Sequence, residues 1–177
     1  MWIYERKLEF PVSIKKTDPK LAMYIMDQFT GTDGELTAAI KYLNQRFSMV
    51  TSEAISTLND IGTEELAHIE LIGSIVHQLT CGADSFDSLR NRFYRNFRGI
   101  NVNFLSSGDP ITDLYEDMAA EQRSRTAYEN LLEIIDDPDV EAPISFLRER
   151  EIVHFQRFGE CLDIVRKHLE KSGMGRI

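Results

Sequence analysis

The stretch that decides the fold is Glu65-Leu66-Ala67-His68, and the same Glu-x-x-His pattern returns at Glu151-Ile152-Val153-His154. On an α-helix, residues three apart lie on one face, so each carboxylate projects on the same side as its imidazole. A further glutamate precedes each motif by 30 residues, Glu35 before the first and Glu121 before the second. Two inward glutamates and two Glu-x-x-His motifs on four helices are the side chains of a carboxylate-bridged dimetal site. The pattern therefore predicts a helical bundle that holds two metal ions.

The two halves of the chain repeat in one register. Such a repeat indicates two copies of a helical hairpin related by approximate symmetry. The alternative is a coincidence among abundant glutamates on solvated helix faces. Adding 86 to a residue number relates four pairs of residues: Glu35 and Glu121, Tyr42 and Tyr128, Glu65 and Glu151, His68 and His154.

The predicted turns place these residues at one depth. We expect the first hairpin to turn near 48–52 and the second near 136–139, so that each ligand lies roughly 20 Å from its turn at about 1.5 Å per residue. In antiparallel helices the ligands are then level with one another. Residues 82–109 supply the long crossover that a ferritin-like bundle needs between its hairpins. We predict an all-α, ferritin-like four-helix bundle, with the whole chain, residues 1–177, as one domain.

Local signals give the expected bounds of the elements. Helices are predicted from Asp18, with a proline next to it, to about Phe47, and from Ser52 to about 82. A third helix begins around Asp109, also before a proline, and a fourth runs from about Ala142 to about Lys171. Residues 1–17 alternate in part between apolar and polar side chains, which predicts an extended N-terminal arm or short strand laid over the bundle or over a neighbouring subunit.

Composition limits the possible functions. The net charge of −9 argues against nucleic acid as a partner, although arginines and aromatic residues alternate within 82–109. No run of about 18 apolar residues is present, so we expect no membrane span. The N-terminus lacks the layout of a secretory signal, and Cys81 and Cys161 form no disulfide framework or Cys-x-x-Cys metal pattern. We therefore expect a cytoplasmic protein.

The third helix carries charged and polar residues on one predicted stripe, namely Asp117, Glu121, Arg125 and Tyr128. Burial of charges is costly unless they are paired or bind a cation. The stripe therefore faces the metal ions or, alternatively, is a solvated face. His77 and His168 lack a glutamate three residues upstream, and we expect them to be ordinary surface or helix-end residues.

Four carboxylates and two imidazoles form an oxygen-rich ligand set that suits manganese or iron. Burial of so many carboxylates without cations would raise their pKa values and destabilise the fold. Two adjacent redox-active ions can exchange two electrons with peroxide or dioxygen. The ligand set alone does not choose among peroxide dismutation, oxygen activation and iron oxidation.

Four segments carry a resemblance to a known family. The chain resembles the manganese catalases, and most closely their spore-coat branch, which also opens on a MWxYExKL-type N-terminus. The likeness breaks down in the crossover, which is short, and after the fourth helix, where the larger catalases carry a long extension. The segments are GTDGELTAAIKYLNQR (31–46), DIGTEELAHIE (60–70), GDPITDLYEDMAAEQRSRTAYENL (108–131) and FLREREIVHFQRF (146–158).

The resemblance implies a dimanganese site that converts hydrogen peroxide to water and oxygen. By motif, Glu35, Glu65 and His68 would hold one manganese, Glu65 would bridge to the second, and Glu121 and His154 would complete the second. Glu151 would move protons without being a firm ligand, and Tyr42 would hydrogen-bond around the ligands.

The resemblance also implies a homo-oligomer, with other spore-coat proteins as further partners and the spore coat as a second location. Two alternatives stay open. One is a di-iron oxidase or peroxidase, and the other is a structural coat component with a vestigial metal site.

Overall fold

The computed structural model describes residues 8–80 and 106–173. These residues form helices and no strand, which confirms the prediction of an all-α protein. No helix among them is long and apolar enough to cross a membrane. The helices are α1 (Pro19–Thr30), α2 (Glu35–Gln45), α3 (Ser52–Thr80), α5 (Pro110–Leu132) and α6 (Pro138–Lys171).

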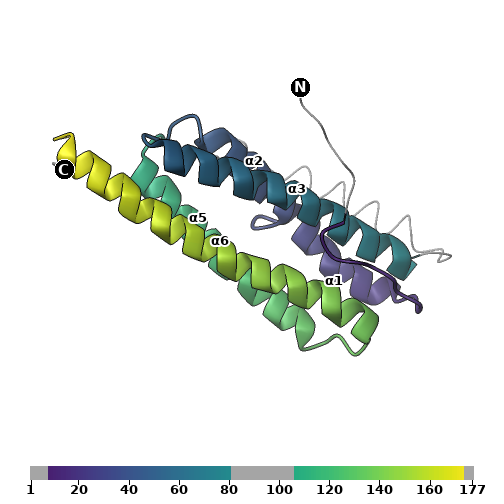
Figure 1. Ribbon diagram of the computed structural model, residues 1–177. Helices are drawn as coiled ribbons and strands as arrows, with labels where there is room; N and C mark the ends of the chain where they lie inside the picture. The colour runs from purple at the N-terminus through teal and green to yellow at the C-terminus, as the bar shows by residue number, and fades with distance from the viewer. Residues whose placement is uncertain (1–7, 81–105, 174–177) are drawn as a thin grey trace, which may run out of the picture.

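The helices build a four-helix bundle in which one of the four positions is shared by α1 and α2 (Figure 1). Both of these short helices pack along the long α3, and α5 packs along α6 to form the second hairpin. α3 also contacts α6, which joins the hairpins. This is the predicted ferritin-like arrangement. Most of the predicted crossover lies outside the described residues.

The prediction of one continuous first helix is wrong in one respect, because the structure has two helices, α1 and α2, in its place. α1 ends at Thr30, before Gly31, whose backbone is extended, and α2 starts after Gly34. Glycine has a low helix propensity, so two glycines three positions apart weaken a continuous helix here. The Thr37 hydroxyl donates a 3.0 Å hydrogen bond to the Gly31 carbonyl. This bond gives a partner to a backbone carbonyl at the end of α1. The break makes Glu35 the first residue of α2.

Three Asp-Pro pairs begin helices in the same way. The side chains of Asp18, Asp109 and Asp137 each accept a hydrogen bond from a backbone N–H in the first turn, and the following proline occupies the first helical position. The third pair was predicted to be a turn. The fourth helix therefore begins at Pro138, four residues before the predicted Ala142.

Two apolar clusters fill the bundle on either side of a polar layer. One cluster gathers residues of α1, the second half of α3 and the α5–α6 turn, and includes Tyr128. The other gathers residues of the α2–α3 turn, the start of α5 and the end of α6, and includes Tyr42. The layer between them holds buried glutamates and histidines of both hairpins.

The described part of the N-terminal arm packs on the first of these clusters. Leu8, Phe10, Val12 and Ile14 are partly buried against it, in the predicted alternation. The Gln78 side chain fixes this path, since it accepts from Ile14 N–H at 2.7 Å and donates to the Val12 carbonyl at 3.1 Å. Residues 8–17 form no strand, so the predicted arm is confirmed there without strand pairing. Residues 1–7 lie outside the described ranges.

Candidate metal centre

All six residues of the predicted constellation lie in the polar layer, and none is more than 2% exposed. They form two groups of four, and in each group one ligand atom per residue lies within 4.8 Å of the others. Glu65 and Glu151 belong to both groups. The first group adds Glu35 and His68, and the second adds Glu121 and His154. The 86-residue register therefore corresponds to a spatial symmetry around one centre.

Glu65 lies between the two imidazoles. Its Oε2 is 2.8 Å from His68 Nδ1, and its Oε1 is 2.9 Å from His154 Nδ1. The two rings face each other with centroids 5.6 Å apart and planes 23° from parallel. Each Nδ1 also lies 3.5 Å from a second carboxylate, Glu35 for His68 and Glu121 for His154. The Nδ1 atoms of both His68 and His154 therefore point at the carboxylates.

Two tyrosines bridge the hairpins in a reciprocal way. The Tyr42 hydroxyl, on the first hairpin, donates to Glu121 on the second, and the Tyr128 hydroxyl donates back to Glu35. Each ring lies in one apolar cluster and its hydroxyl reaches the polar layer. Burial, followed by the neighbouring carboxylates, raises both tyrosine pKa values well above 10, so both hydroxyls stay protonated as donors. Tyr128, a candidate from position alone, thus matches Tyr42.

The carboxylates and imidazoles perturb one another strongly. Burial and the charge of Glu65 raise the pKa of Glu35 to about 8. Burial alone would also raise the pKa of Glu65, but the charges of His154 and His68 hold it well below 4.5. Burial would lower the pKa of His68, yet Glu65 and Glu35 raise it to about 10, and Glu65 also raises that of His154 well above 6.5. Without cations, protons must balance this layer.

Glu151 differs from its symmetry mate, Glu65. Burial, and then the charges of Glu121, Glu35 and Glu65, raise its pKa well above 4.5. This shift favours the protonated form of the Glu151 carboxyl group. Of the two carboxylates that belong to both groups, Glu65 therefore has the lowered pKa and Glu151 the raised one.

The layer has buried carboxylate oxygens that are available to a cation. Within residues 8–80 and 106–173, Oε1 of Glu65, Oε2 of Glu121 and Oε1 of Glu151 make no hydrogen bond of good geometry, although His154 Nδ1 lies near the first two. Buried polar atoms are normally satisfied. An oxygen-rich set with two imidazoles fits manganese or iron better than thiophilic metals. The residues present therefore suit a pair of divalent ions.

A lysine–aspartate pair lies next to one half of the site. Asp117 is fully buried, and its Oδ1 is 2.8 Å from Lys41 Nζ. Burial raises the pKa of Asp117 to about 7 although Lys41 opposes the rise. The predicted stripe is wrong at Arg125, which is half-buried and pairs with Glu129 at 3.0 Å, whereas Ser124 occupies the buried position.

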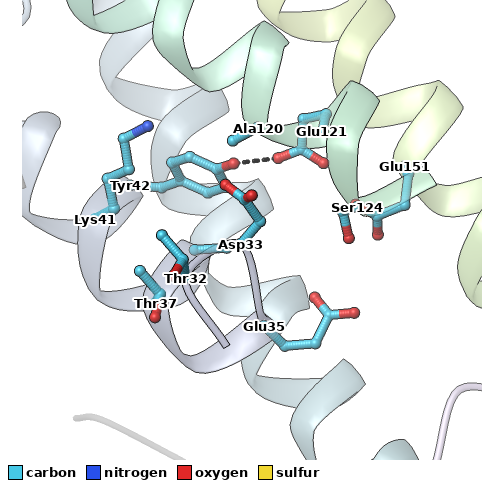
Figure 2. A pocket seen from close by; sticks show the side chains of 11 residues that line it. Thr32, Asp33, Glu35, Thr37, Lys41, Tyr42, Ala120, Glu121, Ser124 and Glu151 are labelled. Carbon is cyan, nitrogen blue, oxygen red and sulfur yellow. Dashed lines mark hydrogen bonds between the residues drawn. The ribbon is translucent and has the colours of Figure 1, made fainter. Parts of the chain in front are cut away.

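A small pocket of about 40 Å³ leads into this layer (Figure 2). Its outer wall includes the exposed Thr32 and the half-buried Asp33, which Arg123 of α5 holds with two hydrogen bonds of 2.8 and 2.9 Å. Its inner wall includes Glu35, Glu121 and Glu151. Because Thr32 and Asp33 belong to the break between α1 and α2, the break opens the bundle at the level of the site. The volume suits a molecule of a few atoms.

Two acidic residues that the sequence pattern did not predict lie behind the histidines. Glu64 lies next to both rings, 3.3 Å from His154 Nε2 and 3.8 Å from His68 Nε2. Glu9, from the N-terminal arm, lies 3.8 Å from His68 Nε2. The register does contain a signal for Glu64, since adding 86 leads to Arg150, a residue of opposite charge. Nothing in the sequence pattern relates Glu9 to the site.

Comparison with known proteins identifies relatives over nearly the whole chain. The family model for manganese containing catalase matches residues 1–92 and 95–172. Protein CotJC of Bacillus subtilis (strain 168) is 43% identical over 97% of this chain and 98% of its own length. A probable manganese catalase of Clostridium acetobutylicum is 30% identical over 99% of this chain and 85% of its own. The crystal structure of wild-type KatB, a manganese catalase from Anabaena, is 29% identical with a TM-score of 0.80, covering 92% of this chain and 80% of that one.

Proposed function

The chain belongs to the family of manganese-containing catalases, and from that premise we propose that it disproportionates hydrogen peroxide to water and oxygen at two manganese ions. One observation supports the proposal more than any other. Four carboxylates and two imidazoles from both hairpins converge in a single buried layer, in which three carboxylate oxygens make no hydrogen bond of good geometry within the described residues. Such a layer is stable when cations balance it.

We assign the ligands by the two groups of atoms. Glu35, Glu65 and His68 would hold one ion, and Glu121 and His154 the other, with Glu65 bridging the two. The position of Glu65 supports this role, because one of its oxygens faces each imidazole. Bound manganese supplies redox chemistry, since each ion can alternate between the two-plus and three-plus states and the pair exchanges two electrons with peroxide.

The remaining residues of the pocket would handle substrate and protons. Peroxide is small enough for the pocket that ends at Glu35, Glu121 and Glu151. Burial and the neighbouring carboxylates raise the pKa of Glu151, which favours its protonated form, so it could give its proton to a departing oxygen and, once deprotonated, take one from the next arriving peroxide. Tyr42 donates to Glu121 and so orients that carboxylate within the layer.

Oxygen release tests the proposal directly. Purified protein is depleted of metal, reloaded with manganese, and given hydrogen peroxide in an oxygen electrode, with elemental analysis of the loaded sample. We expect about one oxygen for every two peroxides consumed. Glu65→Ala should bind no metal pair and release no oxygen. Loaded wild-type protein that evolves no oxygen would contradict the proposal.

The same assay separates the alternatives. Iron in the protein as purified, with peroxide consumed and no oxygen released, would favour a di-iron oxidase or peroxidase. Assembly that survives Glu65→Ala, in a protein inert with either metal, would favour a structural component. We further propose a homo-oligomer in the cytoplasm, deposited in a spore coat in a spore-forming source. Light scattering after size exclusion tests the assembly.

A further inference from the structure

The outer nitrogens of the two histidines, Nε2 of His68 and of His154, meet a second acidic group behind the ligand layer. Both Nδ1 atoms point at Glu65, so each Nε2 points the opposite way, between α3 and α6. Both Nε2 atoms are buried, and neither has a hydrogen bond of good geometry in the described ranges. A ring that binds a metal through Nδ1 carries its proton on Nε2, and that proton needs an acceptor.

One carboxylate serves both rings. Glu64 presents Oε2 to His154 Nε2 at 3.3 Å and Oε1 to His68 Nε2 at 3.8 Å. Arg150 Nε donates to Glu64 Oε1 from the facing helix, which fixes the carboxylate between the rings. The side chain of Glu64 is only 17% exposed, so competing water is largely excluded.

The internal symmetry explains why an acid faces a base here. Glu64 and Arg150 are 86 residues apart and occupy equivalent positions in the two hairpins, directly before the equivalent Glu65 and Glu151. Equivalent positions beside the symmetry axis face each other across it. Two glutamates there would repel each other within an already acidic layer, whereas an acid and a base attract.

We propose that Glu64 is a positioning residue for both histidines, holding the two rings so that each Nδ1 faces the metal ions, with Arg150 holding Glu64 in turn. The proposal rests on the proposed metal centre. Carboxylates that accept the outer N–H of a ligating histidine fix its tautomer and ring orientation, and their loss typically costs about 10–100-fold in metal affinity. The competing explanation is an ion pair that merely ties α3 to α6.

A matched pair of variants distinguishes these explanations. Glu64→Gln and Arg150→Gln both remove the ion pair, but only the first replaces one of the two acceptor oxygens that face the histidines with an amide N–H, so that the side chain can no longer accept from both rings. Manganese affinity and stoichiometry are measured by equilibrium dialysis, and the metal-free melting temperature by circular dichroism. We expect Glu64→Gln to lose about 10–100-fold in affinity and Arg150→Gln to lose much less. Equal losses in the two variants, or an unchanged Glu64→Gln, would overturn the proposal.

Exchanging the acid and the base between positions 64 and 150 gives a second test, which does not depend on Glu64→Gln folding well. Glu64→Arg alone should bind manganese poorly. Adding Arg150→Glu restores one acid and one base at equivalent positions and should recover most of the lost affinity. A double variant no better than Glu64→Arg overturns the proposal. Wild-type protein that binds no metal pair would instead refute the proposed function, so the two failures are distinguishable.

Discussion

At the scale of single residues, the reciprocal tyrosines link each hairpin to the ligands of the other. Tyr42 and Tyr128 are 1% and 0% exposed, and each donates to a buried carboxylate. We expect Tyr42→Phe and Tyr128→Phe each to lower the free energy of unfolding of the metal-free protein by about 1–3 kcal/mol, because a buried acceptor loses its donor. Chemical denaturation measures the loss. Tyr24→Phe is the control, since Tyr24 is 44% exposed and should change stability by less than about 0.5 kcal/mol.

The same residues show what sequence alone could predict. The Glu-x-x-His motifs and their register identified all six residues of the central layer, because helix periodicity fixes which residues share a face. Arg125 was misplaced by one position. With about 100° per residue, Ser124 lies roughly 40° from the centre of the stripe formed by Asp117, Glu121 and Tyr128, and Arg125 roughly 60°. Glu64 was missed because two of its partners, His154 and Arg150, lie on another helix, so only packing brings them together.

At the scale of elements, the break between α1 and α2 positions Glu35 and opens the pocket. A Cβ at Gly34 would lie 2.7 Å from Gly31 N and 2.8 Å from the Gln28 carbonyl oxygen, which are backbone atoms that cannot move aside cheaply. We expect Gly34→Ala to destabilise the protein by about 1–3 kcal/mol and to weaken manganese binding, because Glu35 is the next residue. Thermal unfolding and metal content measure both effects.

Gly159→Ala is the matched control for this prediction. Gly159 lies within α6, and an added Cβ would meet only Met118 Cε at an ordinary 3.6 Å. Alanine is a better helix former than glycine by about 1 kcal/mol, so this variant should be as stable as wild type or more so. If both glycine variants behaved alike, close backbone approach at Gly34 would not be the reason for the break.

Helix ends were predicted where a local signal decides them. Asp18 and Asp109 cap their helices as expected because side chain and backbone of neighbouring residues suffice. Asp137 caps α6 by the same local geometry, but it stands in an acidic run that is equally typical of a turn. The break at residues 31–34 is harder to predict, because isolated glycines are tolerated in helices and packing decides whether the helix continues.

At the scale of the whole molecule, the bundle consists of two apolar clusters around one charged layer. The clusters supply the hydrophobic stabilisation, and the layer opposes it unless its carboxylates and imidazoles are neutralised. Protons or metal ions can do this, and they compete for the same atoms. Stability should therefore depend on pH in opposite senses with and without metal.

The direction follows from the shifted groups. The pKa of Glu35 rises from 4.5 to about 8 and that of His68 from 6.5 to about 10 on folding. A group with a raised pKa binds more protons when folded, so its contribution to stability is full below the unfolded pKa and is lost as pH rises through the folded pKa. The metal-free protein should therefore become less stable between about pH 6 and pH 9, while proton competition for manganese weakens. We expect the rise in melting temperature on adding manganese, measured anaerobically by calorimetry, to be larger at about pH 8.5 than at about pH 6.5. An increment that stays constant over this range would mean that these groups do not bind the metal.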